Sequence, residues 1–156
     1  MFDVPLDAWY SWVGLSLASL ALLGVVTSLP TTAPPNATAV ANTVDRVAAS
    51  DHATTAEHPV DATAIRLGPH RVGLRNDGGT AHTSYAFGSV TPVPDDSPLQ
   101  QVLYGRPPDD VFDSRRAFQQ ALLEARTAEP TWKPVDRTLV VRRLSWEGVD
   151  AVLVDA

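Results

Sequence analysis

An uncharged run near the beginning of the chain constrains its fold more than any other feature. The run extends from Trp9 to Leu29 and consists largely of leucine, alanine, valine, serine and glycine. At a rise of 1.5 Å per residue, a helix of that length covers the roughly 30 Å of a bilayer core. The run therefore predicts one transmembrane helix over 9–29, preceded by a short N-terminal tail over 1–8.

A cleaved secretory signal and a buried helix are the alternatives to a retained anchor. A signal has a basic first region and a shorter apolar core, whereas the tail here carries Asp3 and Asp7 and no lysine or arginine. The nearest Ala-x-Ala cleavage pattern, over 39–41, lies well beyond the run. These features favour the retained anchor.

The side chains of the run predict how such a span is placed and packed. Aromatic rings at one end of a span favour the headgroup layer, and here they are Trp9, Tyr10 and Trp12. A stripe of small side chains lets two helices approach closely, with chance composition as the alternative. That stripe consists of Gly14, Ala18, Ala21, Val25 and Ser28.

Residues 30–38 are rich in proline and threonine, which predicts a short extended stalk. The stalk contains Asn36-Ala37-Thr38, an acceptor pattern for N-glycosylation that has meaning only outside the cytoplasm. No lysine or arginine lies near either end of the uncharged run to set the orientation. We expect a single-pass protein of the cell membrane, with the N-terminus inside and the domain outside.

The charge balance limits the classes of partner. The chain has 18 acidic and 12 basic residues and a formal charge of −6, which argues against nucleic acid as the main partner. Excess carboxylates are tolerated near molar salt, where the Debye length is about 3 Å, although a GC-rich genome produces a similar bias. The chain has no cysteine, which excludes disulfides and thiolate metal sites.

Residues 39–156 are predicted to form one small α+β domain. Apolar spacing predicts a short helix over 39–49 and a longer amphipathic helix over 115–128, with Asp113 as its N-cap. Alternating apolar residues and turn residues predict three strands and a closing hairpin. The predicted strands cover 64–67, 71–75, 80–87, 137–146 and 149–154.

Both faces of the closing hairpin carry apolar residues, so we expect it at the centre of the sheet. The polar segment 50–61 and the proline-rich segment 92–108 are predicted to be irregular. The expected fold is thus a transmembrane helix followed by an antiparallel sheet of about five strands with one packed amphipathic helix.

Residues that could catalyse a reaction or bind a metal are scattered along the sequence. The four histidines lack metal-site spacing, and the pairs Asp95-Asp96 and Asp109-Asp110 lie in proline-rich loops without an EF-hand pattern. No nucleophile elbow or phosphate-binding loop is present. We therefore predict no catalytic, cofactor-binding or metal-binding residue, and a protein that is not an enzyme.

Several blocks of the sequence resemble an uncharacterised family of small haloarchaeal membrane proteins. The blocks include MFDVPLDAWYSWVGL, RLGPHRVGLRNDGGTAH and LVVRRLSWEGVDAVLVDA. The resemblance implies that some relatives are encoded beside type IV pilus or secretion-type machinery. The chain departs from archaeal pilins because it lacks their processing site, and Pro30, Pro34 and Pro35 interrupt a long helix. The resemblance thus implies an unprocessed accessory component.

These observations predict a non-catalytic, membrane-anchored accessory or assembly protein that presents a small extracytoplasmic interaction domain. The expected partners are membrane lipid and other membrane or pilus-type proteins. The alternative is a tethered domain that senses a small ligand or ion through the loops around Asp95 or His70.

Overall fold

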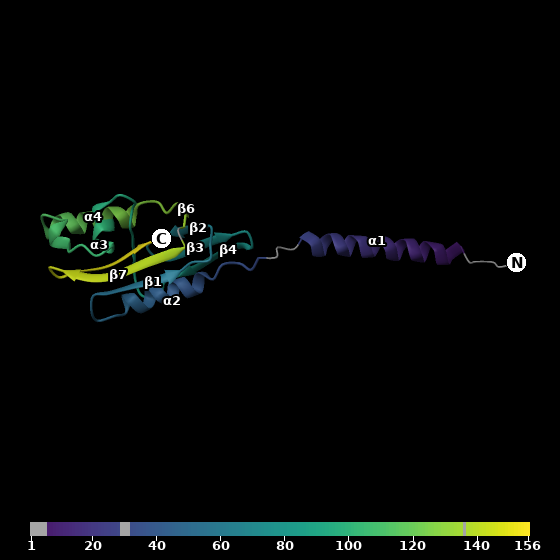
Figure 1. The fold of residues 1–156 in the computed structure, drawn as a ribbon, viewed down its shortest axis with the longest axis horizontal. Helices are drawn as coiled ribbons and strands as arrows, with labels where there is room; N and C mark the ends of the chain where they lie inside the picture. The colour runs from purple at the N-terminus through teal and green to yellow at the C-terminus, as the bar shows by residue number, and fades with distance from the viewer. Residues whose placement is uncertain (1–5, 29–31, 136) are drawn as a thin grey trace. The chain divides into compact units, whose positions relative to one another are not determined.

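The computed structural model describes residues 6–28, 32–135 and 137–156. The chain divides into two units, Met1–Thr32 and Ala33–Ala156 (Figure 1). The first unit contains a single helix, α1 (Leu6–Ser28). The second, which we call the compact unit, contains the remaining helices and all described strands. The predicted stalk overlaps 29–31, which lie outside the described residues.

Helix α1 corrects the transmembrane part of the predicted fold. In the described part of the chain, no helix combines the length and the apolarity that a membrane crossing requires. The predicted transmembrane helix over 9–29 is therefore wrong. The prediction relied on missing charge, but uncharged residues are not all apolar: Ser16 and Ser19 donate hydrogen bonds to the carbonyls of Trp12 and Leu15.

The first sheet of the compact unit, sheet A, has the strand order β1-β7-β8-β5. Its central hairpin joins β7 (Thr138–Trp146) to β8 (Val149–Asp155), which confirms the predicted central position. Strand β5 (Thr91–Pro92) runs parallel to β8. Strand β1 (Thr54–Pro59) pairs with β7 at the opposite edge. The segment 50–61 was predicted to be irregular; that is wrong for β1, a polar edge strand without an apolar signal.

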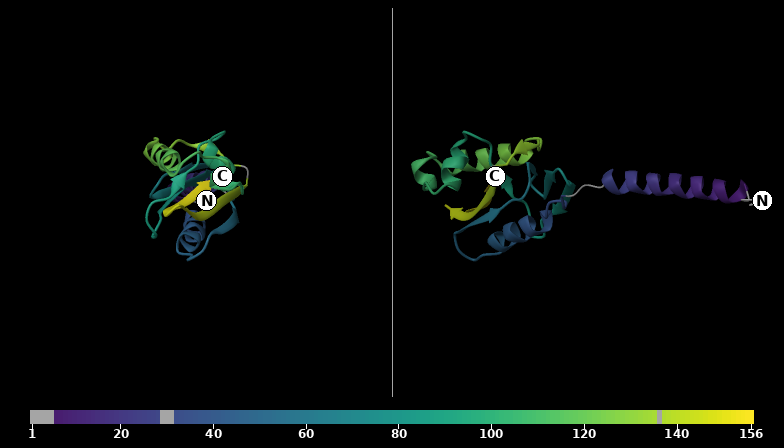
Figure 2. Two further views of the ribbon diagram at one scale, coloured as in Figure 1. Left: turned by 90° about the vertical axis from the view of Figure 1, so that its left-hand side faces the viewer. Right: turned by 45° about the vertical axis from the view of Figure 1, so that its right-hand side comes forward.

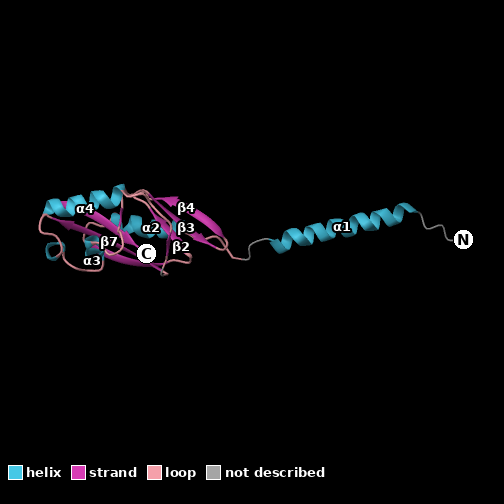
Figure 3. Ribbon diagram, turned by 90° about the horizontal axis from the view of Figure 1, so that it is seen from above, coloured by secondary structure: helices cyan, strands magenta, loops and turns pink. Residues whose placement is uncertain are grey.

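The second sheet, sheet B, has the order β4-β3-β2-β6. Strands β2 (Ala64–Leu67), β3 (Arg71–Asn76) and β4 (Gly79–Ser84) form the predicted antiparallel meander and lie side by side (Figure 3). Strand β6 (Lys133–Pro134) pairs with β2. The expectation of one sheet of about five strands is wrong, because the described strands form two four-stranded sheets.

Helices cover both faces of sheet A (Figures 1 and 2). Helix α2 (Ala37–Ala48) packs its valines with the inner residues of β2, β3 and β7 in one apolar cluster. Helices α3 (Pro98–Leu103) and α4 (Arg115–Thr127) form a second cluster with the other face of β7 and β8. The alternation of side chains along β7 and β8 supplies both clusters, since successive residues face opposite sides of a sheet.

The helix ends explain two further corrections. Ser114, and not the predicted Asp113, caps α4: its hydroxyl accepts a hydrogen bond from the Ala117 N–H. In the proline-rich segment 92–108, Ser97 caps α3, whose first residue is a proline. A short 3₁₀ helix follows at Pro108–Asp110. The prediction that this whole segment is irregular is therefore wrong.

Two neighbouring arginines of β7 join sheet A to the helices on its two faces. The Arg142 guanidinium donates to the Val102 carbonyl near the end of α3. The Arg143 guanidinium donates to the Ala48 carbonyl at the end of α2, at 2.6 Å. Both carbonyls lie in the last turn of their helix, where the i+4 partner is missing; the Val102 carbonyl also accepts from the Gly105 N–H. Adjacent strand residues thus fix one helix on each side of the sheet.

Candidate functional site

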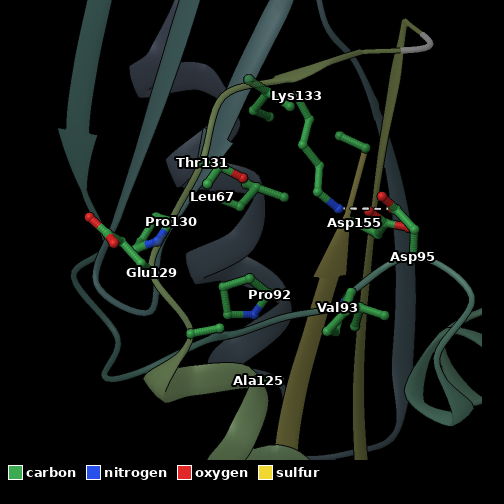
Figure 4. Close-up of a pocket in the computed structure, with 14 residues that line it drawn as sticks. Leu67, Pro92, Val93, Asp95, Ala125, Glu129, Pro130, Thr131, Lys133 and Asp155 are labelled. Atoms are coloured by element: carbon green, nitrogen blue, oxygen red, sulfur yellow. Dashed lines mark hydrogen bonds and ion pairs between the residues drawn. The ribbon is translucent and has the colours of Figure 1, made fainter.

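The compact unit contains a pocket of about 320 Å³ beside the C-terminal end of α4 (Figure 4). Strands β2, β5, β6 and β8 contribute to its walls, so edges of both sheets meet there. The lining residues are Ile65, Leu67, Pro92, Val93, Pro94, Asp95, Ala125, Ala128, Glu129, Pro130, Thr131, Lys133, Asp155 and Ala156.

Most of the pocket wall is apolar. Ile65 and Leu67 come from β2, Pro92 and Val93 from β5 and the residue after it, and Pro130 from the segment that follows α4. Figure 4 shows Leu67, Pro92, Val93 and Pro130 around one open space, with Lys133 reaching toward Asp95. The rigid proline rings and the two sheets preform this wall, as is usual for small-molecule sites.

An ion pair and a buried carboxyl form the polar part of the pocket. The Lys133 ammonium lies 2.8 Å from an Asp95 carboxylate oxygen, and both side chains are partly exposed. Such a pair contributes at most about 1 kcal/mol to stability. A charged ligand group can therefore replace either partner at little cost.

Asp155 is the buried member of this group, with 5% of its surface exposed. Burial raises the pKa of its carboxyl because the charged form loses solvation, while hydrogen bonds from the Ala156 N–H and the Gln100 amide oppose that shift. The Gln100 amide donates at 3.3 Å and also accepts from the Asp96 N–H through its oxygen. Gln100 thus connects α3 to the pocket.

The polar groups of the pocket wall are few. Thr131 provides the pocket's only side-chain hydroxyl, and no histidine lies in the wall. Over the residues that the structure describes, no group of three or more histidines and carboxylates is close enough to hold a metal ion. The pocket fits an apolar group that carries one polar or charged end.

The residues predicted on the uncharged run all belong to α1. Trp9, Tyr10 and Trp12 are 62–69% exposed, and the rings of the first two form an edge-to-face contact at 5.3 Å. The predicted small stripe, from Gly14 to Ser28, follows one side of the helix. Its described side chains are exposed, and a Cβ added at Gly14 would have no atom within 4 Å. The side chain of Ser28 is outside the described part.

The remaining predicted residues lie apart from one another. Asn36 is exposed and caps α2 through a hydrogen bond from the Ala39 N–H to its side-chain oxygen, at 3.0 Å. Asp95 lines the pocket, whereas His70 is in the turn between β2 and β3 and is not a lining residue. The structure therefore does not bring the two proposed sensing loops together at this pocket.

Sequence reasoning missed Asp155 and Gln100. Asp155 has the same strand alternation as Ala151 and Leu153, which are buried. An acidic residue at an inward position of a strand is a signal of a buried polar site. Gln100 gives no such signal, because its position depends on α3. That helix was not predicted, since it lies in a proline-rich segment.

Comparison with known proteins gives one match. Residues 3–144 match a family model that is described as a family of unknown function (DUF7283). No curated protein and no solved structure matches the chain significantly.

Proposed function

The chain belongs to DUF7283, a family of unknown function, and we propose that it is a non-catalytic accessory or assembly protein. In this role α1 packs against another protein, and the compact unit presents a second interaction surface. The role requires a partner for α1 and does not depend on a membrane span.

The observation that carries the proposal is the exposure of α1. Between Trp9 and Val25, every large apolar side chain except Val13 is at least 60% exposed. Contiguous apolar surface of this extent marks an interaction site, since water favours its burial by about 25 cal/mol per Å². The small stripe at Gly14, Ala18 and Ala21 suits close packing of a second helix there.

The class of partner follows from the sequence resemblance. That resemblance implies relatives encoded beside type IV pilus or secretion-type machinery, and a haloarchaeal assembly of that kind is the partner that we propose. The acceptor pattern at Asn36 supports placement of the compact unit outside the cytoplasm, and its side chain is exposed at the start of α2. The pocket, with its apolar wall and its ion pair, supports a role in binding.

The proposal is tested by recovering partners of the affinity-tagged full chain from its native cells. The variant Leu15→Asp places a charge on α1, and Leu123→Asp is its matched control, because both leucines are 62% exposed. We expect the wild type and Leu123→Asp to recover the same pilus-type or secretion-type subunits. Leu15→Asp should lose them.

Two outcomes would contradict this function. Wild-type chain that recovers no such subunit would remove the assembly role. Equal losses with Leu15→Asp and Leu123→Asp would show that charge anywhere on the surface disturbs recovery, and would remove the role of α1.

A small-ligand sensing unit is the second candidate, because the pocket contains Asp95 and has room for a ligand (Figure 4). Thermal unfolding of the full chain against a panel of metabolites tests it. A ligand of this site should raise the midpoint for the wild type and less so for Lys133→Met. A panel without any shift would remove this candidate.

A further inference from the structure

The outer face of sheet B carries basic side chains around one tryptophan. Along β3, Val72 and Leu74 are buried on the inner face, and Arg71 and Arg75 are exposed on the other. Gly73 lies between the two arginines. Its neighbours in register are Arg66 on β2 and His82 on β4. We call this set, together with Trp132, the arginine–tryptophan face.

Trp132 is half-buried at the centre of this face. The guanidinium carbon of Arg75 lies 4.2 Å from the centre of the indole ring, and that of Arg66 lies 5.4 Å from it. The His82 ring is tilted against the indole at 5.9 Å. Guanidinium groups at these distances are attracted to the indole, so the tryptophan orders both arginines.

Gly73 makes this arrangement sterically feasible. A Cβ at this position would lie 2.6 Å from the Nδ1 atom of His82 and 3.2 Å from the indole of Trp132. A glycine inside a strand weakens it and marks a place where another group approaches the backbone closely. Here the approaching groups are two aromatic rings. The position of the two rings thus depends on the missing side chain at Gly73 in β3, and not on surface side chains alone.

No carboxylate in the described part of the chain neutralises the arginines of this face. Within the described ranges, the only ion pair between side chains joins Lys133 to Asp95, which belong to the pocket. Arg66, Arg71 and Arg75 therefore have no described carboxylate within 4 Å. Three basic residues gather on one sheet face of a chain with a formal charge of −6. Such a surface is complementary to an anionic partner.

We propose that the arginine–tryptophan face binds an acidic segment of a partner protein, which rests on the proposed role in assembly. Carboxylates of the segment pair with the guanidinium groups, each of which can donate two parallel hydrogen bonds to one carboxylate. Trp132 contacts the segment between them. Arg71 and Arg75 are four residues apart on one strand, which corresponds to roughly 13 Å. An extended segment with two acidic residues four positions apart matches that spacing.

An acidic peptide fits this face better than a nucleic acid does. Nucleic-acid binding draws on many phosphate contacts, about 6–10 in typical complexes, whereas this face offers three arginines. The net negative charge of the chain also repels a long polyanion. A short acidic segment needs few contacts and experiences less of that repulsion.

Fluorescence anisotropy with the purified full chain tests the proposal. The probe is a labelled nine-residue peptide of serine and threonine with two glutamates four positions apart, and its control carries glutamine in their place. The double variant R71Q/R75Q removes two guanidinium groups of the face. The double variant R115Q/R116Q removes the same charge from exposed residues at the start of α4.

We expect the wild type and R115Q/R116Q to bind the glutamate peptide and not the glutamine peptide. R71Q/R75Q should lose about tenfold or more in affinity, which corresponds to about 1.4 kcal/mol. Trp132→Leu, which keeps the charges, should weaken binding by a smaller factor. Unchanged unfolding midpoints of the variants confirm that they are folded.

Three results would overturn the proposal. Equal binding of the two peptides would show that carboxylates are not recognised. Equal losses in R71Q/R75Q and R115Q/R116Q would show a response to net charge alone. Tighter binding of a nine-nucleotide oligothymidylate would assign the face to nucleic acid. None of these results involves α1, so they are distinguishable from failure of the proposed function, which the Leu15→Asp variant tests.

Discussion

The apolar residues of α1 are exposed, whereas those of α2 are buried. In α2, Val40, Val44 and Val47 are at most 2% exposed and lie on one side of the helix, against sheets A and B. In α1, apolar residues occur on all sides, and Leu15 and Leu22 are 62% and 67% exposed. A helix with one apolar stripe can be covered by its own chain. A helix with apolar residues on all sides needs packing contacts around its whole circumference, which contact along a single face does not provide.

The largest difference in unfolding free energy between the two regions is expected when an aromatic ring is removed from the core. Phe118 is fully buried on α4 and makes edge-to-face contacts with Phe112 and Trp146, at ring distances of 5.3 and 5.6 Å. We expect Phe118→Ala to lower the free energy of unfolding of the compact unit by about 3–5 kcal/mol, because it leaves a cavity. Leu22→Ala on α1 should change it by less than about 0.5 kcal/mol. Denaturant titration measures both, and similar losses would contradict the comparison.

Substitution of one glycine in each region extends the comparison between the compact unit and α1. Gly73→Ala forces a methyl group against His82 and Trp132 and should cost about 1–3 kcal/mol of unfolding free energy. Gly14→Ala meets no atom within 4 Å on α1. It should increase helix content by circular dichroism, since alanine is favoured over glycine in helices by about 1 kcal/mol. A Gly73→Ala protein as stable as the wild type would show that the two rings do not lie on the strand.

Loss of the N-cap of α4 should lower the free energy of unfolding by less than loss of the Phe118 ring. Ser114→Ala removes the acceptor for the Ala117 N–H, and we expect a loss of about 1 kcal/mol. Asp113→Ala is the adjacent control and should change the free energy of unfolding by less than about 0.5 kcal/mol. If Asp113→Ala were the more costly change, the capping residue would be the one that the sequence predicted.

Substitution of Asp155 should have the smallest effect on the free energy of unfolding, and that effect should depend on pH. Burial raises its pKa in the folded state above the ordinary value of 3.8, so the folded state holds the proton more tightly than the unfolded state does. The contribution of Asp155 to stability therefore falls as the pH rises from that value through its folded-state pKa. We expect Asp155→Asn to gain stability relative to the wild type over this interval. A difference that stays constant or shrinks with pH would contradict the raised pKa.

The elements that the sequence predicted correctly have strong periodic signals. Helix α2 repeats valine at helical spacing, and β7 and β8 carry apolar residues on both faces, which placed them at the centre of a sheet. Strands β1, β5 and β6 were missed because β1 is polar and the other two have two residues each, including a proline. Short edge strands of this kind depend on pairing with the core strands and have little sequence signal of their own.

The binding surfaces were less predictable than the fold. Lys133 and Asp95 meet across the pocket from distant parts of the chain, as do Trp132, Arg66 and Arg75 on sheet B. Spacing along the sequence cannot reveal such contacts without the strand register. On α1 the error had another source: the absence of charge and the length of the run were together taken as sufficient for a membrane span.

The most direct test of the account is photo-cross-linking in the native cells. A photoreactive residue replaces either Leu15 on α1 or Leu123 on α4, two positions of equal exposure. The account predicts that position 15 cross-links to another protein of an assembly and that position 123 does not. Cross-links from position 15 only to the compact unit of the same chain, or to no protein at all, would contradict it.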